Sequence, residues 1–219
     1  LTEEIEASLT RLNTDYMDLF QVHFPDRSVP IEETLRALDD LVRQGKILYI
    51  GVSNFSAWET AEAVLTSRNF GLSPVISLQS DYSLLQRGVE KEIIPFCTAF
   101  NIGMIPYYPL ASGFLTGKYK RGEALPDGTR LAGMPDGPYR NRFLNEGNFE
   151  VLAVLEDFAQ QRGHSVLELA IAWLNSQPQV TSVISGATKA EQVEQNAKAA
   201  DWTLSESDLQ DLETALKAA

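Results

Sequence analysis

The sequence predicts an α/β fold built on a parallel sheet. Short runs rich in Val, Ile and Leu alternate with longer stretches whose apolar residues recur at helical spacing. The short runs are continuously apolar, as strands covered on both faces are, and such strands belong to parallel sheets. No G-x-G-x-x-G turn follows the first strand, which disfavours a doubly wound dinucleotide-binding sheet. We therefore expect about five parallel strands of an eight-stranded (β/α)8 barrel, a partial barrel in which the helices surround the strands.

The first half of the chain shows regular alternation of the two patterns. Leu1, Ile5 and Leu9 recur at helical spacing, and a later helical stretch has acidic residues in its first turn and Gly45 past its end. Runs of Val and Ile between such stretches have strand length. In order, the predicted elements are helix 1–12, strand 17–23, helix 30–44, strand 47–52, helix 57–65, strand 75–79, helix 89–100 and strand 102–107.

The second half opens with segment 110–147, which is rich in Gly and Pro. It is longer than a simple connection needs, and long loops after strand ends usually act on ligands, with a flexible insertion as the alternative. Beyond it, the same two patterns predict helices 149–162 and 166–175, strand 181–184, helix 190–199 and a last helix from Ser205.

Composition excludes several classes of protein. The 219 residues are 44% hydrophobic and 22% charged, as in folded globular proteins, and the net charge of -12 makes nucleic acid and anionic membranes poor partners. No apolar run approaches the ~20 residues of a membrane span, and no signal-peptide pattern is present. The single cysteine, Cys97, lies among apolar neighbours and predicts a buried thiol in a reducing cytoplasm. Because Leu1 already stands inside an amphipathic pattern, we expect a cut through a longer protein.

Polar side chains stand where four of the predicted strands end. In a barrel, the carboxyl ends of the strands face the active site. A histidine there can donate a hydrogen bond to a carbonyl oxygen, amide groups suit a carboxamide such as nicotinamide, and a tyrosine offers a flat ring. The alternative for each one is a satisfied structural polar group. The strand-end residues are His23, Ser53, Asn54, Gln79 and Tyr107.

A turn of small residues follows the last predicted strand and leads into a helix. Backbone amides and the positive end of a helix dipole make such a turn a phosphate site after the late strands of barrels, and Lys189 adds a positive charge. A plain helix start capped by Thr188, with Glu191 in the first turn, is the alternative. The chain has two histidines and no cluster of ligands at metal-binding spacing, so no metal site is proposed.

Several ordered blocks resemble the aldo-keto reductase family, across nearly the whole chain. They comprise DYMDLFQVH at 15–23, IGVSNF at 50–55, YSLL at 82–85 with Arg87, YYPL at 107–110, LTGKY at 115–119, AIAWL at 170–174, and Gly186-Ala187 with Glu191, Gln192 and Asn196. The resemblance implies an NADP-dependent oxidoreductase on a TIM barrel, in which hydride passes from NADPH to an aldehyde or ketone.

The resemblance also assigns roles by position. His23 would hold the substrate carbonyl, and Tyr107 would stack on the nicotinamide ring. The carboxamide would meet Ser53, Asn54 and Gln79; the pyrophosphate and its covering loop would meet Leu110, Ser112 and Lys118; the 2′-phosphate side would meet Gly186, Thr188 and Lys189; and the adenine would meet Gln192 and Asn196.

One departure from the family pattern is large. The catalytic tyrosine of the family, its lysine and its aspartate belong to units before the fourth strand, and no D-x-A-x-x-Y pattern occurs here. We therefore expect residues 1–219 to form a single barrel domain that is truncated at its N-terminus. We expect this domain to be inactive by itself, since loss of a general acid lowers the reaction rate by ~10²–10⁴. Two other hypotheses are a non-catalytic nicotinamide-nucleotide-binding module or assembly subunit, and an aldolase or isomerase barrel, which lacks a strand-end Schiff-base lysine here.

Overall fold

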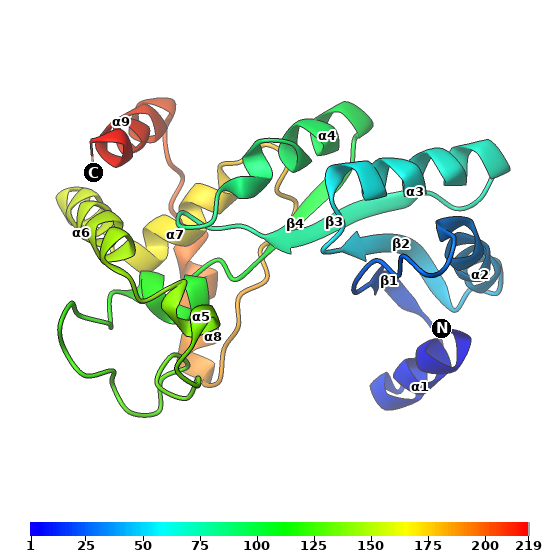
Figure 1. Cartoon of the computed structure of the whole chain (residues 1–219), viewed down its shortest axis with the longest axis horizontal. Helices are drawn as coiled ribbons and strands as arrows, with labels where there is room; N and C mark the ends of the chain where they lie inside the picture. Colours follow the sequence, from blue (N-terminus) through cyan, green and yellow to red (C-terminus); the bar gives the residue numbers. More distant parts are fainter. Residues whose placement is uncertain (219) are drawn as a thin grey trace. The chain divides into compact units, whose positions relative to one another are not determined.

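The computed structural model describes residues 1–218, in which helices and strands alternate up to β4 and helices dominate afterwards (Figure 1). These residues group into two compact units. Unit 1 comprises Leu1–Ser80 and Val89–Ile105, and unit 2 comprises Asp81–Gly88 and the chain from Pro106 onward. Strands β3 and β4 each begin in unit 1 and end in unit 2.

Unit 1 is built from helix and strand pairs. Its elements are α1 (Thr2–Leu12), β1 (Met17–Val22), α2 (Ile31–Arg43), β2 (Ile47–Ser53), α3 (Ala57–Phe70), most of β3 (Val75–Asp81), α4 (Ile93–Phe100) and the start of β4 (Gly103–Tyr107). Helix α3 runs further than its apolar pattern predicts because both its ends are capped: Ser56 and Glu59 form a capping box, and Gly71 adopts the left-handed conformation after the last turn.

The strands form one sheet in the order β1-β2-β3-β4. β1 pairs with β2 and β2 with β3 in parallel, in a register that places Gln21 opposite Gly51 and Gly51 opposite Ser77. A register shift between Ile50 and Gly51 interrupts the second ladder. The parallel sheet and its helices confirm the predicted α/β class.

The core of unit 1 lies between the strands and helices α2, α3 and α4. Leucines of α2 pack with the apolar face of β2 and β3, and the side chain of Cys97 on α4 is fully buried there. Burial raises the pKa of the Cys97 thiol to about 11, so the thiol stays protonated and behaves as a small apolar group. The predicted buried cysteine is confirmed.

Unit 2 is mostly helical. It contains η2 (Ala111–Thr116), α5 (Pro138–Asn141), α6 (Glu146–Gln161), α7 (Val166–Asn175), α8 (Ala190–Ala199) and α9 (Glu206–Lys217), and the short η1 (Gly88–Glu90) stands at its border with unit 1. Helix α7 is buried along most of its length, and its Trp173 packs edge-on against Tyr82 with ring centroids 5.1 Å apart. The Arg87 guanidinium lies 5.2 Å from the centroid of the Trp173 ring.

Two larger differences from the predicted elements concern the run 181–184 and the start of helix 89–100. In the described part of the chain, the apolar run 181–184 forms an isolated parallel bridge, Ile184 with Tyr107, in place of a strand. At this bridge the Ile184 N–H donates to the Pro106 carbonyl of β4 at 2.9 Å. Helix 89–100 begins only at Ile93, after the separate turn η1. In the part of the chain that the structure describes, no helix is both long enough and apolar enough to span a bilayer.

Candidate active and cofactor site

Four of the predicted site residues lie together in unit 1, at the ends of β1, β2 and β3. Asn54, just past β2, adopts a left-handed backbone with φ of 61° and ties the cluster together. Its backbone N–H donates to the Gln79 carbonyl at 2.9 Å, and its side-chain amide donates to the His23 carbonyl at 2.9 Å. The same amide reaches Ser53 Oγ at 3.1 Å, and that hydroxyl donates to Gln79 Oε1 at 3.4 Å. Parallel pairing brings these side chains to one edge, as the strand-end argument predicts.

This cluster offers polar groups that can meet a ligand. The imidazole of His23 is exposed beside the ring of Phe24, with centroids 4.4 Å apart, so its nitrogens can reach a carbonyl oxygen. Gln79 Oε1 accepts a hydrogen bond from Ser53, but within residues 1–218 the side-chain NH2 of Gln79 donates none. A left-handed asparagine that binds the backbone of a neighbouring strand costs conformational energy, which functional sites commonly carry.

The predicted pyrophosphate residues lie in unit 2, on the strained turn after β4. Tyr108, Ala111 and Ser112 all have positive φ, between 47° and 58°. The Ser112 hydroxyl is buried and has no hydrogen-bond partner in the described part of the chain. Gly113 follows with φ of 87°, and a methyl group there would lie 2.9 Å from Lys118 Nζ. The absence of a side chain at Gly113 thus lets the lysine ammonium approach the turn.

The late turn of unit 2 carries the residues predicted for the adenosine end. Gly186, Thr188 and Lys189 are exposed before α8. The alternative interpretation, a Thr188 cap, is wrong: Lys189 is the N-cap, and its side chain makes no capping bond. The backbone N–H and the hydroxyl of Thr188 instead both donate to Gln192 Oε1, at 2.7 and 3.2 Å. Asn196 follows one turn after Gln192 on the same helix, so the two share a face.

Sequence reasoning missed a group of residues around Tyr107. Asp81, at the end of β3, forms an ion pair with Arg142, and Tyr108 accepts hydrogen bonds from Arg130 and Tyr139. Asp81 stands two residues after Gln79, so its position at a strand end was a usable signal. Arg130, Tyr139 and Arg142 belong to a loop-rich segment with no periodicity, where no local pattern indicates a partner.

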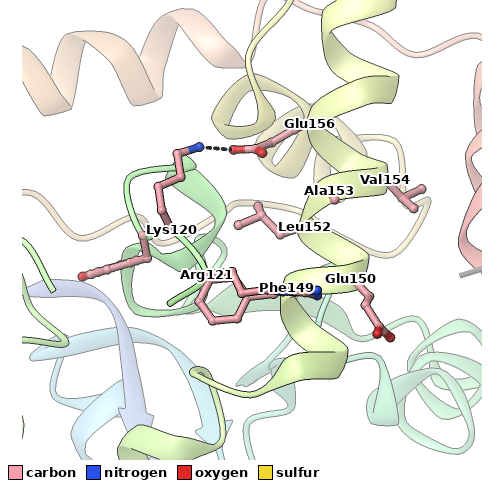
Figure 2. A pocket seen from close by; sticks show the side chains of 9 residues that line it. Lys120, Arg121, Phe149, Glu150, Leu152, Ala153, Val154 and Glu156 are labelled. Atoms are coloured by element: carbon pink, nitrogen blue, oxygen red, sulfur yellow. Dashed lines mark hydrogen bonds and ion pairs between the residues drawn. The ribbon is translucent and has the colours of Figure 1, made fainter. Parts of the chain in front are cut away.

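A pocket of about 520 Å³ lies elsewhere in unit 2, between α6 and the chain at Lys120 and Arg121. Figure 2 shows the side chains that line it. Phe149 and Leu152 form its apolar floor, and Lys120 Nζ lies 3.2 Å from Glu156 Oε1 at one side. None of the predicted site residues lines this pocket. This pocket is therefore separate from the predicted cofactor residues.

The parallel strands, the strand-end polar cluster and the ordered sequence blocks define a class of protein. The chain belongs to the aldo/keto reductase family, whose sequence profile matches residues 1–217. The predicted family resemblance is confirmed, and this family is one of oxidoreductases.

Relatives with different names are similar to this chain. The chain is 40% identical over 202 residues to a probable voltage-gated potassium channel subunit beta of Arabidopsis thaliana, across 92% of this chain and 61% of the relative. It is 37% identical over 202 residues to L-glyceraldehyde 3-phosphate reductase of Escherichia coli, across 91% and 58%. It is 37% identical over 218 residues to aldo-keto reductase YhdN of Bacillus subtilis, across 99% and 63%. The chain thus spans about three fifths of the length of these relatives.

Proposed function

We propose that the chain holds the nicotinamide-binding and carbonyl-facing part of an NADPH-dependent oxidoreductase that reduces aldehydes or ketones to alcohols. The observation that carries this proposal is the cluster in which Asn54 joins the ends of β1, β2 and β3. It leaves an amide donor on Gln79 and an exposed imidazole on His23 at one edge of the sheet. In the setting of an aldo/keto reductase, these groups fit a carboxamide and a substrate carbonyl.

The residues of unit 2 fit the rest of a dinucleotide. The Ser112 hydroxyl is buried and has no partner in the described part of the chain, and the Lys118 ammonium lies close to Gly113. Both are donors from which a pyrophosphate oxygen can accept hydrogen bonds. Leu110 precedes this turn as an apolar wall, and Lys118 supplies its charge. Gly186, Thr188 and Lys189 would meet the 2′-phosphate, and Gln192 and Asn196 would meet the adenine.

NADPH supplies the hydride when it is bound, and the residues of this chain prepare the acceptor for it. His23 donates a hydrogen bond to the substrate carbonyl oxygen, which polarises the carbonyl and orients its carbon. Ser53, Asn54 and Gln79 would hold the carboxamide, and Tyr107 would pack against the nicotinamide ring. These residues thereby favour the geometry in which hydride transfer occurs.

The proton that completes the alcohol comes from elsewhere in this proposal. The family resemblance implies a tyrosine acid with a lysine and an aspartate, and we assign these to the part of the relatives' length outside the match. The barrel domain of residues 1–219 would then bind the cofactor but turn over ~10²–10⁴ more slowly than a complete reductase, because it lacks a positioned general acid. We place the protein in a reducing cytoplasm, which its single buried thiol supports.

A fluorescence titration with NADPH and NADH tests this proposal. We expect micromolar binding of NADPH with preference over NADH, and loss of that preference in Lys189→Glu. Lys198→Glu, an exposed lysine in the last turn of α8, is the matched control and should bind as the unaltered chain does. Equal binding of both nucleotides, or equal losses in the two variants, would contradict the assigned 2′-phosphate site.

A second candidate function is an assembly subunit that binds the nucleotide without turnover. The match to a protein named as a potassium channel subunit beta favours it. Aldehyde-dependent oxidation of NADPH separates the candidates. The protein tested is one that binds NADPH and is extended to the full length of the relatives. If it oxidises NADPH in the presence of an aldehyde, it is a reductase. If it binds NADPH without turnover, and light scattering shows that it forms a larger assembly, it is the subunit.

A further inference from the structure

An ion pair joins the end of β3 to the chain just after α5. Arg142 pairs with the carboxylate of Asp81, whose side chain is only 17% exposed. Burial raises the pKa of Asp81, and the arginine beside it opposes that shift. The Arg142 guanidinium also lies over the rings of Tyr139 and Phe143, at 5.4 and 4.6 Å from their centroids. A planar cation held by two rings and a half-buried carboxylate has less freedom than an exposed surface pair.

A second contact ties the same part of the chain to the residue after β4. Tyr108 Oη accepts hydrogen bonds from Arg130 Nη2 and Tyr139 Oη, both at 3.1 Å. The Arg130 guanidinium also lies 5.0 Å from the centroid of the Tyr108 ring. Segment 120–142 contains no element longer than the four residues of α5. Besides these contacts, it is held by the ion pair of Lys120 with Glu156 and by the Leu131 N–H, which donates to Tyr119 Oη.

Tyr107 stands between the two attachment points. Its phenol is hydrogen-bonded to the Asp81 backbone, and its ring packs edge-on against Tyr108, with centroids 5.1 Å apart. Burial and the neighbouring Asp81 carboxylate raise the pKa of the Tyr107 phenol. The orientation of this ring therefore depends on the same two residues that receive segment 120–142.

We propose that Asp81 and Arg142 are positioning residues that hold segment 120–142 against the strand ends and orient the Tyr107 ring, and so set how long a bound nicotinamide dinucleotide is retained. This inference rests on the proposed function, since it assumes that Tyr107 faces the nicotinamide. Without the pair, the segment detaches more often from Asp81 and the ring loses one side of its support. A dinucleotide beneath that segment then escapes faster, while its entry is little affected.

Three measurements on Asp81→Asn, Arg142→Gln and the double variant test the proposal. Hydrogen exchange of the free protein reports attachment, and we expect protection of segment 120–142 to fall about tenfold in each single variant with no further fall in the double variant. The ring resonance of Tyr107 in ¹³C-tyrosine-labelled protein, assigned with Tyr107→Phe, should shift in both single variants. Stopped-flow fluorescence should show NADPH dissociation about tenfold faster and an association rate within about twofold of the unaltered chain.

Arg162→Gln is the matched control, because it removes an ion pair of unit 2 that joins Arg162 to Asp208 at 2.7 Å, and both residues lie outside segment 120–142. It should leave all three measurements unchanged. Unaltered protection in both single variants, or faster exchange without faster NADPH dissociation, would overturn the proposal. If the unaltered chain binds no NADPH, the proposed function and the retention effect fail together. Hydrogen exchange and the Tyr107 signal then still decide, separately, whether the pair holds the segment.

Discussion

Replacing Gly51 with alanine should destabilise the sheet of unit 1, because the strand has no room for a methyl group. Gly51 is buried in β2, opposite Gln21 on β1 and Ser77 on β3. A Cβ atom at this position would lie 2.4 Å from Ser77 Oγ, 3.0 Å from Gln21 Cγ and 3.3 Å from Leu19 Cδ1. The first of these distances is far inside van der Waals contact, so Ser77 must move.

The expected loss follows from two opposing contributions. Overpacking of a core position costs about 1–3 kcal/mol, and alanine regains about 0.5–1 kcal/mol of backbone entropy relative to glycine within a strand. The difference spans about 0–2.5 kcal/mol, and we expect the free energy of unfolding to fall by an amount near the middle of this range, about 1 kcal/mol. The Ser77 hydroxyl is buried without a partner among residues 1–218, so Ser77→Ala alone should be neutral or stabilising.

Urea denaturation of Gly51→Ala, Ser77→Ala and the double variant measures these changes. The double variant should recover most of the loss, with a coupling energy of about 1 kcal/mol, because the serine oxygen that blocks the methyl group is gone. Gly88→Ala is the control, since its nearest neighbour would lie 3.6 Å away. A stable Gly51→Ala protein, or strictly additive effects in the double variant, would refute the steric explanation.

Three further changes test other parts of the structure. Gly147→Ala, inside the first turn of α6 with only an ordinary contact at 3.5 Å, should raise the free energy of unfolding by about 0.5–1 kcal/mol, read from the urea midpoint. A hydrogen bond from Arg162 lowers the pKa of Asp208 to about 2 from the ordinary 3.8. The ionised Asp208 therefore stabilises the fold fully above about pH 4, and this stabilisation is lost as the pH falls through about 2. In thermal unfolding, the melting temperature of Arg162→Gln should fall less on acidification than that of the unaltered chain. Asp39→Ala leaves the Ser73 N–H without its acceptor at 2.8 Å and should cost about 1–3 kcal/mol in urea, whereas Asp39→Asn, which keeps an acceptor oxygen, should cost less; equal losses would contradict this account.

Much of the fold could be predicted because it is recorded in local patterns. The helical spacing of α2 and the apolar run of β2 depend on side chains within one or two turns, and the structure places both elements within a few residues of the prediction. Element ends were less accurate where caps decide them: α3 extends to Phe70 because Gly71 supplies the left-handed stop. The run 181–184 has strand composition, yet strand pairing depends on which backbone lies beside it.

Some residues of the candidate site could be predicted from the sequence, and others could not. His23, Asn54 and Gln79 could be proposed together because parallel strands end at one edge, and the structure joins them by hydrogen bonds. Whether these residues bind a nicotinamide dinucleotide stays a prediction that the titration decides. Asp81 and Arg142 are 61 positions apart, and nothing local in either neighbourhood indicates the other.

The sequence by itself determined the α/β class, the order of helices and strands, the family and the strand-end polar residues, because these depend on periodicity, capping and short motifs. Only the tertiary structure decided how the left-handed Asn54 joins three strands, why Gly51 has no room for a side chain, and which arginine of the long segment reaches Asp81. Such features depend on residues distant in the chain meeting at particular distances, and those distances are set by how whole elements pack.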